Sequence, residues 1–225
     1  GLKSIADIAG IPPANTRRYL VSLIRSGLVQ QDSATGKYNL GPIALQIGLA
    51  AIMGLNLVRT AVPIMTELRE VVRETVVLTV WGDHGPTIIH WEESLVPITV
   101  NARIGSVFPV LDTATGHVYL TWLPREQTKN VVKQEMRHRN KDNPIDIGAI
   151  VETTKKNGIG RFFIEDMRSL STLAAPIFNH KNKLIAVITT FGYKDKFDNS
   201  PTGPNARALL DAAGRISFEM GYNEA

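Results

Sequence analysis

The sequence predicts an α+β protein with a small N-terminal helical module, a helical connector and a larger domain built on a mostly antiparallel sheet. Three observations lead to this prediction. Two helical patterns separated by consecutive prolines occupy residues 5–26, and a short hairpin pattern follows at 28–40. An uncharged helical stretch begins at Pro42. Beyond Glu74, strand-like runs and helical patterns are mixed without a regular βα alternation, which favours an α+β domain.

The first two elements are defined by their end residues. Ser4 is a suitable N-cap for a helix over residues 5–9, and Gly10 can end that helix. Pro13 can begin a second helix, because its missing N–H costs nothing at the first helical position. Apolar residues then recur at helical spacing up to Gly27. The two helices around a proline turn therefore predict a helix-turn-helix.

A short hairpin is expected directly after this pair of helices. Residues 28–32 have an extended pattern, 33–36 contain turn residues, and 37–40 are extended again. A helix-turn-helix followed by a hairpin is a winged helix-turn-helix. We therefore expect residues 1–41 to form a winged helix-turn-helix DNA-binding domain.

The connector is expected to be a helix from Pro42 to Met53 within a linker of residues 42–56. No charged residue occurs from Tyr38 to Val58, a stretch long enough in principle to span a bilayer. Pro42, Gln46 and several glycines interrupt its apolar character. A helix packed against protein, such as a second subunit, is therefore favoured over a membrane span, and no membrane partner is expected.

Residues 57–225 are expected to form the larger domain. Helices are predicted at 57–74, 114–123, 125–136, 145–157 and 205–221, with a kink or restart at Pro63 and Asp112 or Thr113 as the cap of the second. Strands are predicted at 76–81, 87–92, 98–102, 161–164, 173–178 and 184–191, and a charged loop at 138–142.

The charge of the chain is uneven. The net charge is +4, and residues 1–41 carry five basic and two acidic groups, against 20 and 19 in the remainder. A basic N-terminal end suggests an anionic partner there. The chain has no cysteine, which excludes disulfides, thiolate nucleophiles and cysteine zinc sites and agrees with a cytoplasmic location. It begins without Met or a signal peptide, so an upstream segment is expected to be missing.

The second helix is the candidate DNA-reading element. In a helix-turn-helix, the second helix enters the major groove and its first residues meet base edges. Asn can bond adenine, Arg can bond guanine, and a methyl group can meet thymine. Arg18 and Lys37 of the wing are better placed for phosphates. The predicted DNA-binding set is Pro13, Ala14, Asn15, Thr16, Arg17, Arg18 and Lys37. The alternative is an ordinary helical hairpin with solvated arginines.

These residues resemble the IclR family of bacterial transcription factors. The likeness rests on an ordered set of segments: Gly10-Ile11-Pro12, Arg18 with Leu20 and Leu23, Gly27-Leu28-Val29, Gly36-Lys37-Tyr38-Asn39-Leu40-Gly41, Glu74-Thr75, Ile104-Gly105 with Phe108-Pro109, Thr113-Ala114-Thr115-Gly116, and Leu173-Ala174-Ala175-Pro176-Ile177. It covers nearly the whole chain. The resemblance implies a winged helix-turn-helix, a dimerising linker helix and a GAF-like domain that binds a small organic effector. It also implies a homodimer or homotetramer that controls a catabolic operon, as repressor or activator. The first helix of the family's DNA-binding domain is expected to be absent from this chain.

The resemblance places the effector near the start of the helix at 114. Free N–H groups at a helix N-terminus hold a carboxylate well. The implied effector-binding set is Val100, Phe108, Thr113, Ala114, Thr115, Phe162, Leu170, Thr172, Thr189 and Phe191. Phe162 and Phe191 replace polar residues common in members that bind small keto acids. The sequence therefore predicts an aromatic or partly apolar organic acid, unless these two rings are simply core.

No other chemistry is expected. None of the five histidines is paired at metal-ligand spacing, so no metal site is predicted. Gly36-Lys37 lacks the opening glycine of a phosphate loop, Gly158 and Gly160 lack the third glycine of a dinucleotide fingerprint, and no nucleophile elbow occurs, so no cofactor and no catalytic residue is predicted. Three functions remain: an effector-responsive transcriptional regulator, a winged-helix protein-interaction module, and an enzyme with a sensor-like domain.

Overall fold

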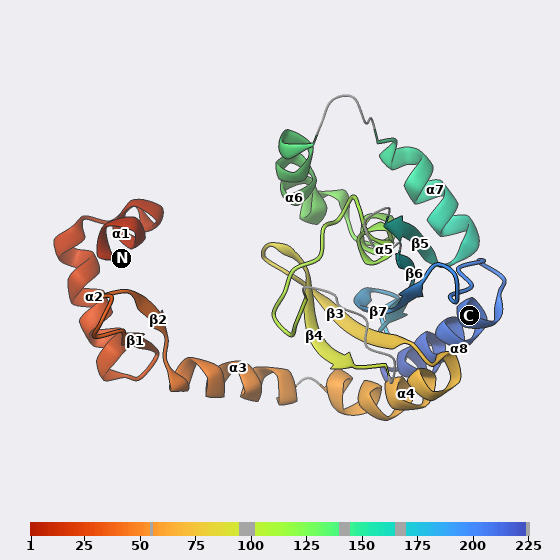
Figure 1. Cartoon of the computed structure of the whole chain (residues 1–225), viewed down its shortest axis with the longest axis horizontal. Helices are drawn as coiled ribbons and strands as arrows, with labels where there is room; N and C mark the ends of the chain where they lie inside the picture. Colours follow the sequence, from red (N-terminus) through yellow and green to blue (C-terminus); the bar gives the residue numbers. More distant parts are fainter. Residues whose placement is uncertain (55, 95–101, 140–144, 165–169, 224–225) are drawn as a thin grey trace. The chain divides into compact units, whose positions relative to one another are not determined.

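The computed structural model describes residues 1–54, 56–94, 102–139, 145–164 and 170–223 (Figure 1). The chain divides into two compact units, residues 1–56 and 57–225. No helix in the described parts of the chain is both long and apolar enough to cross a membrane.

The N-terminal unit holds the three helices that the sequence predicts. Its helices are α1 (Leu2–Ala9), α2 (Pro13–Arg25) and α3 (Pro42–Gly54). Helix α1 begins at Leu2 rather than after Ser4, and no side chain caps it. Gly10 adopts a left-handed conformation with φ of 65°, and its N–H bonds back to the helix, so it ends α1 as expected. Pro13 is the first residue of α2, which confirms its predicted role.

The hairpin is formed by β1 (Val29–Gln31) and β2 (Tyr38–Leu40), paired antiparallel with Val29 opposite Leu40. Asp32 organises the turn between them. Its Oδ1 accepts hydrogen bonds from the backbone N–H groups of Ala34 (2.8 Å) and Thr35 (2.9 Å), and these bonds lower the pKa of the Asp32 carboxyl. The helix pair and the hairpin together form the predicted winged helix-turn-helix.

The C-terminal unit is built on a five-stranded antiparallel sheet in the order β4-β3-β7-β6-β5. The strands are β3 (Thr75–Gly82), β4 (Gly85–Glu92), β5 (Gly160–Ile164), β6 (Leu170–Phe178) and β7 (Leu184–Tyr193). The central strands β7, β3 and β6 are almost wholly buried, because helices cover both faces of the sheet.

Five helices complete this unit (Figure 1): α4 (Asn56–Val72), α5 (Ala114–Trp122), α6 (Arg125–His138), α7 (Ile147–Asn157) and α8 (Pro204–Glu219). Helices α4 and α8 pack on one face of the sheet and form the main core, which includes Met65, Leu173 and Ile216. Helix α5 covers the other face through Val118 and Tyr119. The α+β class and the mostly antiparallel sheet are therefore as predicted.

Some details differ from the sequence prediction. Pro63 lies inside a continuous α4 rather than at a restart. His138 is the last residue of α6, so the loop expected from this position begins later. Asp146 caps α7 by accepting a hydrogen bond from the N–H of Ala149, which starts the helix two residues later than predicted. The strand expected at 98–102 lies almost entirely outside the described residues.

Gly116 is required by the packing of α5, and Gly116→Ala is expected to destabilise the fold. An added Cβ would lie 2.1 Å from the backbone oxygen of Val110, where neither backbone can yield. We expect a loss of about 1–3 kcal/mol or more in the free energy of unfolding, measured in urea. Gly214→Ala is the matched control, because Gly214 lies in α8 with open space around it. That substitution should be neutral or stabilising, and equal losses in the two variants would contradict the argument.

Candidate DNA interface and effector pocket

The start of α2 presents polar side chains to the surface. Pro13, Ala14, Asn15, Arg17 and Arg18 are all exposed. No side chain caps the helix, and the described residues supply no acceptor for the N–H groups of Ala14 and Asn15. The free N–H groups of such a helix start can donate hydrogen bonds to a phosphate oxygen while neighbouring side chains reach into a groove.

Thr16 differs from its neighbours and corrects the sequence prediction. It is only 3% exposed, and its hydroxyl donates a hydrogen bond to the backbone oxygen of Pro12 at 3.1 Å. A buried hydroxyl with an internal acceptor does not reach a base edge. Thr16 therefore holds the proline turn against α2 and orients its exposed neighbours.

Lys37 lies on the wing at the end of its turn. Its side chain is exposed, and its backbone oxygen accepts a hydrogen bond from the N–H of Asp32 at 2.9 Å. Gly36 before it has φ of 66°, a left-handed conformation that suits glycine. The wing thus presents a cation from a fixed backbone.

In the C-terminal unit, most residues expected at the effector site surround one hollow. Its lining comes from the loop before α5, the first turn of α5, and strands β6 and β7: Phe108, Thr113, Ala114, Thr115, Leu170, Thr172, Thr189 and Phe191. Thr115 and Thr189 are buried, and their hydroxyls lie 2.8 Å apart. The remaining wall is chiefly aromatic and aliphatic.

The N-terminus of α5 opens at this hollow. Thr113 is the N-cap, and its hydroxyl accepts a hydrogen bond from the N–H of Gly116 at 2.9 Å. Within the described part of the chain, the N–H groups of Ala114 and Thr115 have no acceptor. Two open donors and the positive end of the helix dipole can bind a carboxylate.

Two residues predicted to line the effector site are not among the described residues that line the hollow. Phe162 lies on the edge strand β5, and its ring packs edge-on against His117, 5.5 Å between ring centres, so it does not line the hollow. Its backbone oxygen instead accepts a hydrogen bond from the hydroxyl of Thr172. Val100 lies outside the described residues.

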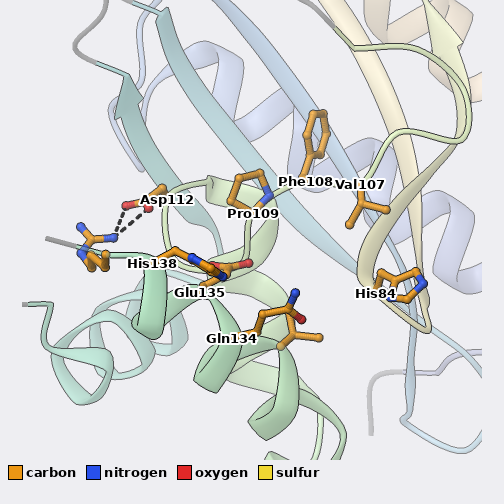
Figure 2. A pocket seen from close by; sticks show the side chains of 10 residues that line it. His84, Val107, Phe108, Pro109, Asp112, Gln134, Glu135 and His138 are labelled. Carbon is orange, nitrogen blue, oxygen red and sulfur yellow. Dashed lines mark hydrogen bonds and ion pairs between the residues drawn. The ribbon is translucent and has the colours of Figure 1, made fainter. Parts of the chain in front are cut away.

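The hollow is small and adjoins a larger cleft. It measures about 50 Å³, whereas small-molecule sites usually range from about 300 to 1,000 Å³. Phe108 also lines a cleft of about 510 Å³ between α6 and the β3–β4 turn, shown in Figure 2 with His84, Pro109 and Glu135 on its walls. An acid of aromatic size can therefore enter the hollow only if side chains such as Phe108 move.

His117 connects α5 to the loop before it and gives the fold a pH dependence. Its Nε2 lies 2.9 Å from the backbone oxygen of Leu111. Burial lowers the pKa of the His117 imidazole, although the bond to Leu111 opposes this shift. The folded chain then binds the proton less tightly than the unfolded chain.

The contribution of neutral His117 to the free energy of unfolding is therefore expected to be complete above the pKa of the unfolded chain, about 6.5. The free energy of unfolding should decrease as the pH drops below that value. Urea titrations between pH 8 and 5 on the wild-type chain and on His117→Gln measure this contribution. The variant should show a weaker dependence on pH, and an identical pH profile would contradict the assignment.

Among the described residues, no group of three or more histidines or carboxylates could hold a metal ion. The residues that sequence reasoning missed are Glu135 in α6 and Arg139 directly after it, which bind the loop before α5.

Comparison with known proteins assigns both units to one family. The C-terminal domain model of the bacterial transcriptional regulator IclR matches residues 49–218, and the IclR helix-turn-helix model matches residues 1–33. The chain is 24% identical to the HTH-type transcriptional regulator KdgR of Escherichia coli, over the whole chain and 87% of that protein.

Solved structures agree. The crystal structure of HmgR from Pseudomonas aeruginosa is 32% identical, with a TM-score of 0.69, covering 100% of this chain and 91% of that one. An IclR homologue from Microbacterium hydrocarbonoxydans, solved in complex with 4-hydroxybenzoate, is 18% identical with a TM-score of 0.73, covering 98% and 90%. The chain belongs to the IclR family of bacterial transcriptional regulators.

Proposed function

We propose that this regulator binds operator DNA through the exposed start of α2 and senses a partly apolar organic acid in the hollow at the start of α5. The observation that carries the DNA proposal is the exposure of three polar side chains, Asn15, Arg17 and Arg18. The buried Thr16 orients them. Asn15 and Arg17 read bases, with Pro13 and Ala14 beside them, while Arg18 and Lys37 hold phosphates.

The proposed effector is an aromatic carboxylic acid. The open N–H groups of Ala114 and Thr115 would take its carboxylate, and Phe108, Leu170 and Phe191 would contact its ring. The related structure that holds 4-hydroxybenzoate supports this class. Because the hollow is small, binding requires the lining side chains to rearrange, and that rearrangement is the signal.

The proposed division of the chain follows from these roles. Residues 1–41 form the DNA-binding domain, 42–56 the linker and 57–225 the effector-binding domain. Helix α3 would join two copies, because Leu45, Ile47 and Leu49 are exposed on a helix without charge. A dimer or tetramer presents two reading helices to two half-sites in the cytoplasm.

Leu45→Lys is expected to shift the protein towards monomer, because it places a charge on the apolar surface of α3. Leu45 is 65% exposed in the single chain, so the substitution should not disturb the fold. Sedimentation velocity over a concentration series measures the shift. Val71→Lys is the matched control, since Val71 is 70% exposed on α4. Unchanged assembly of Leu45→Lys would contradict the role of α3.

Thermal-shift screening followed by calorimetry tests the effector class. The panel contains benzoate, 4-hydroxybenzoate, glyoxylate and pyruvate. We expect tight binding of an aromatic acid, and tight binding of glyoxylate or pyruvate alone would contradict the proposal. Recovery of the bound acid unchanged separates a sensor from an enzyme, and DNA binding separates a regulator from a protein-interaction module.

A further inference from the structure

Helix α6 holds the loop that leads into α5. Both carboxylate oxygens of Glu135 accept hydrogen bonds from adjacent backbone N–H groups, Oε1 from Val110 at 2.7 Å and Oε2 from Leu111 at 2.9 Å. Val110 and Leu111 are fully buried, so water does not replace Glu135 as their acceptor. One side chain therefore satisfies two buried donors that would otherwise be unpaired.

Arg139 adds a second contact to the next residue of the loop. Its Nη1 lies 2.7 Å from each carboxylate oxygen of Asp112. Dashed lines at the labelled Asp112 mark this ion pair in Figure 2. Glu135 lies in the last turn of α6, and Arg139 is the residue that directly follows the helix as its C-cap, so one end of α6 carries both side chains. The Asp112 side chain is 47% exposed, so this ion pair is screened by water and holds the loop less firmly than Glu135 does.

Residues of α5 also contact the same loop. Gly116 approaches the backbone of Val110 so closely that no Cβ fits, and His117 contacts the backbone oxygen of Leu111. The ends of the loop carry Phe108 and Thr113, which line the hollow. Thr113 also caps α5. The position of this wall of the hollow therefore depends on the contacts between α6 and residues 110–112 of the loop.

We propose that Glu135 and Arg139 are positioning residues of the effector site: they fix residues 110–112 and so place Phe108 and Thr113 against the ligand. We call these two side chains the α6 clamp. The clamp does not line the hollow itself and acts only through the loop. This inference rests on the proposed function, because it takes the hollow to be the effector site.

Amide hydrogen exchange, resolved by NMR on the full chain, tests the clamp without any ligand. Glu135→Gln keeps the shape of the side chain but replaces one acceptor oxygen by an amide NH2 group, which cannot accept a hydrogen bond. We expect exchange of the Val110 and Leu111 amides to accelerate about tenfold or more, as is typical for loss of a buried charge-assisted bond. Arg139→Gln should have a smaller effect, confined to the same loop.

Glu126→Gln is the matched control, because Glu126 lies exposed on α6 and forms its ion pair with Lys129 of the same helix. Its exchange pattern should equal that of the wild-type chain. If the Val110 and Leu111 amides exchange in Glu135→Gln at the wild-type rate, the clamp is wrong. Acceleration across the whole chain, accompanied by a lower melting temperature, would show general loosening and would also overturn it.

Calorimetry with benzoate and 4-hydroxybenzoate tests the link to the effector. For an acid that the wild-type chain binds, we expect about tenfold weaker binding by Glu135→Gln and unchanged binding by Glu126→Gln. Faster loop exchange with unchanged affinity would overturn the positioning role. A third outcome is possible, in which loop exchange is faster in Glu135→Gln but the wild-type chain binds neither acid. That outcome would support the clamp and would contradict only the proposed effector class.

Discussion

Replacing Arg17 with alanine is expected to remove much of the preference for operator over unrelated DNA. Arg17 is exposed in the second turn of α2, where a guanidinium can bond the O6 and N7 of guanine. Such a bidentate contact contributes about 1–3 kcal/mol of discrimination, or about 5- to 150-fold in relative affinity. Fluorescence anisotropy with an operator duplex and a scrambled duplex measures the ratio of the two dissociation constants.

Two further variants separate base reading from phosphate contacts. Lys37→Ala should weaken binding to both duplexes alike and reduce the dependence of affinity on salt by about one phosphate contact. Arg25→Ala, at the other end of α2, should leave the ratio unchanged, because eight residues of helix place it about 12 Å further along the axis. If Arg17→Ala and Lys37→Ala gave the same pattern of losses, the assigned division of labour would be incorrect.

Replacing Thr115 with phenylalanine is expected to abolish the response to the acid. Thr115 is 1% exposed at the start of α5, and its hydroxyl lies beside that of Thr189 in a hollow of about 50 Å³. A phenyl ring there fills the hollow and blocks the open N–H groups. The change in operator affinity on adding acid, measured by anisotropy, should disappear.

A smaller substitution provides the control for this variant. Thr115→Ser keeps the hydroxyl and adds no volume, so the response to acid should persist. DNA binding in the absence of acid should survive in both variants, because the reading helix lies in the other unit. If Thr115→Phe lost DNA binding although its circular dichroism and melting temperature matched the wild-type chain, the hollow would be misassigned as the effector site.

Much of the fold could be predicted from local signals. Pro13 at the start of α2, Gly10 and Gly158 in left-handed conformations after α1 and α7, and Thr113 as the cap of α5 all have the roles that their chemistry suggests. These signals depend on few neighbours, so a single sequence contains them. Pro63 lies inside α4 without the restart offered as one of two alternatives, because packing of α4 on the sheet tolerates a proline within a helix.

The site was less predictable, because it depends on contacts between distant residues. Thr16 lies between surface residues in the sequence, yet the proline turn buries it. Phe162 lies one strand beyond Thr172 at the sheet edge, and this position directs its ring to His117. No sequence pattern marks Glu135, since its two partners are backbone N–H groups 24 and 25 residues away.

The acid can either release the regulator from its operator or recruit it to the operator. Both outcomes follow from the same coupling, since effector and operator change each other's affinity by an equal factor. A coupling of about 1–3 kcal/mol corresponds to a change of about 5- to 150-fold in operator affinity. The direction of that change in operator affinity decides whether the protein acts as a repressor or an activator. The occurrence of any such change shows that the protein is a sensor.

Anisotropy titration of the duplex upstream of the protein's own gene, with and without each acid of the panel, tests the central claim most directly. The account predicts tighter binding to this duplex than to a scrambled one, with a salt dependence of several phosphate contacts, and one aromatic acid that changes the dissociation constant at least about fivefold. Equal affinity for both duplexes, unaffected by every acid, would contradict it.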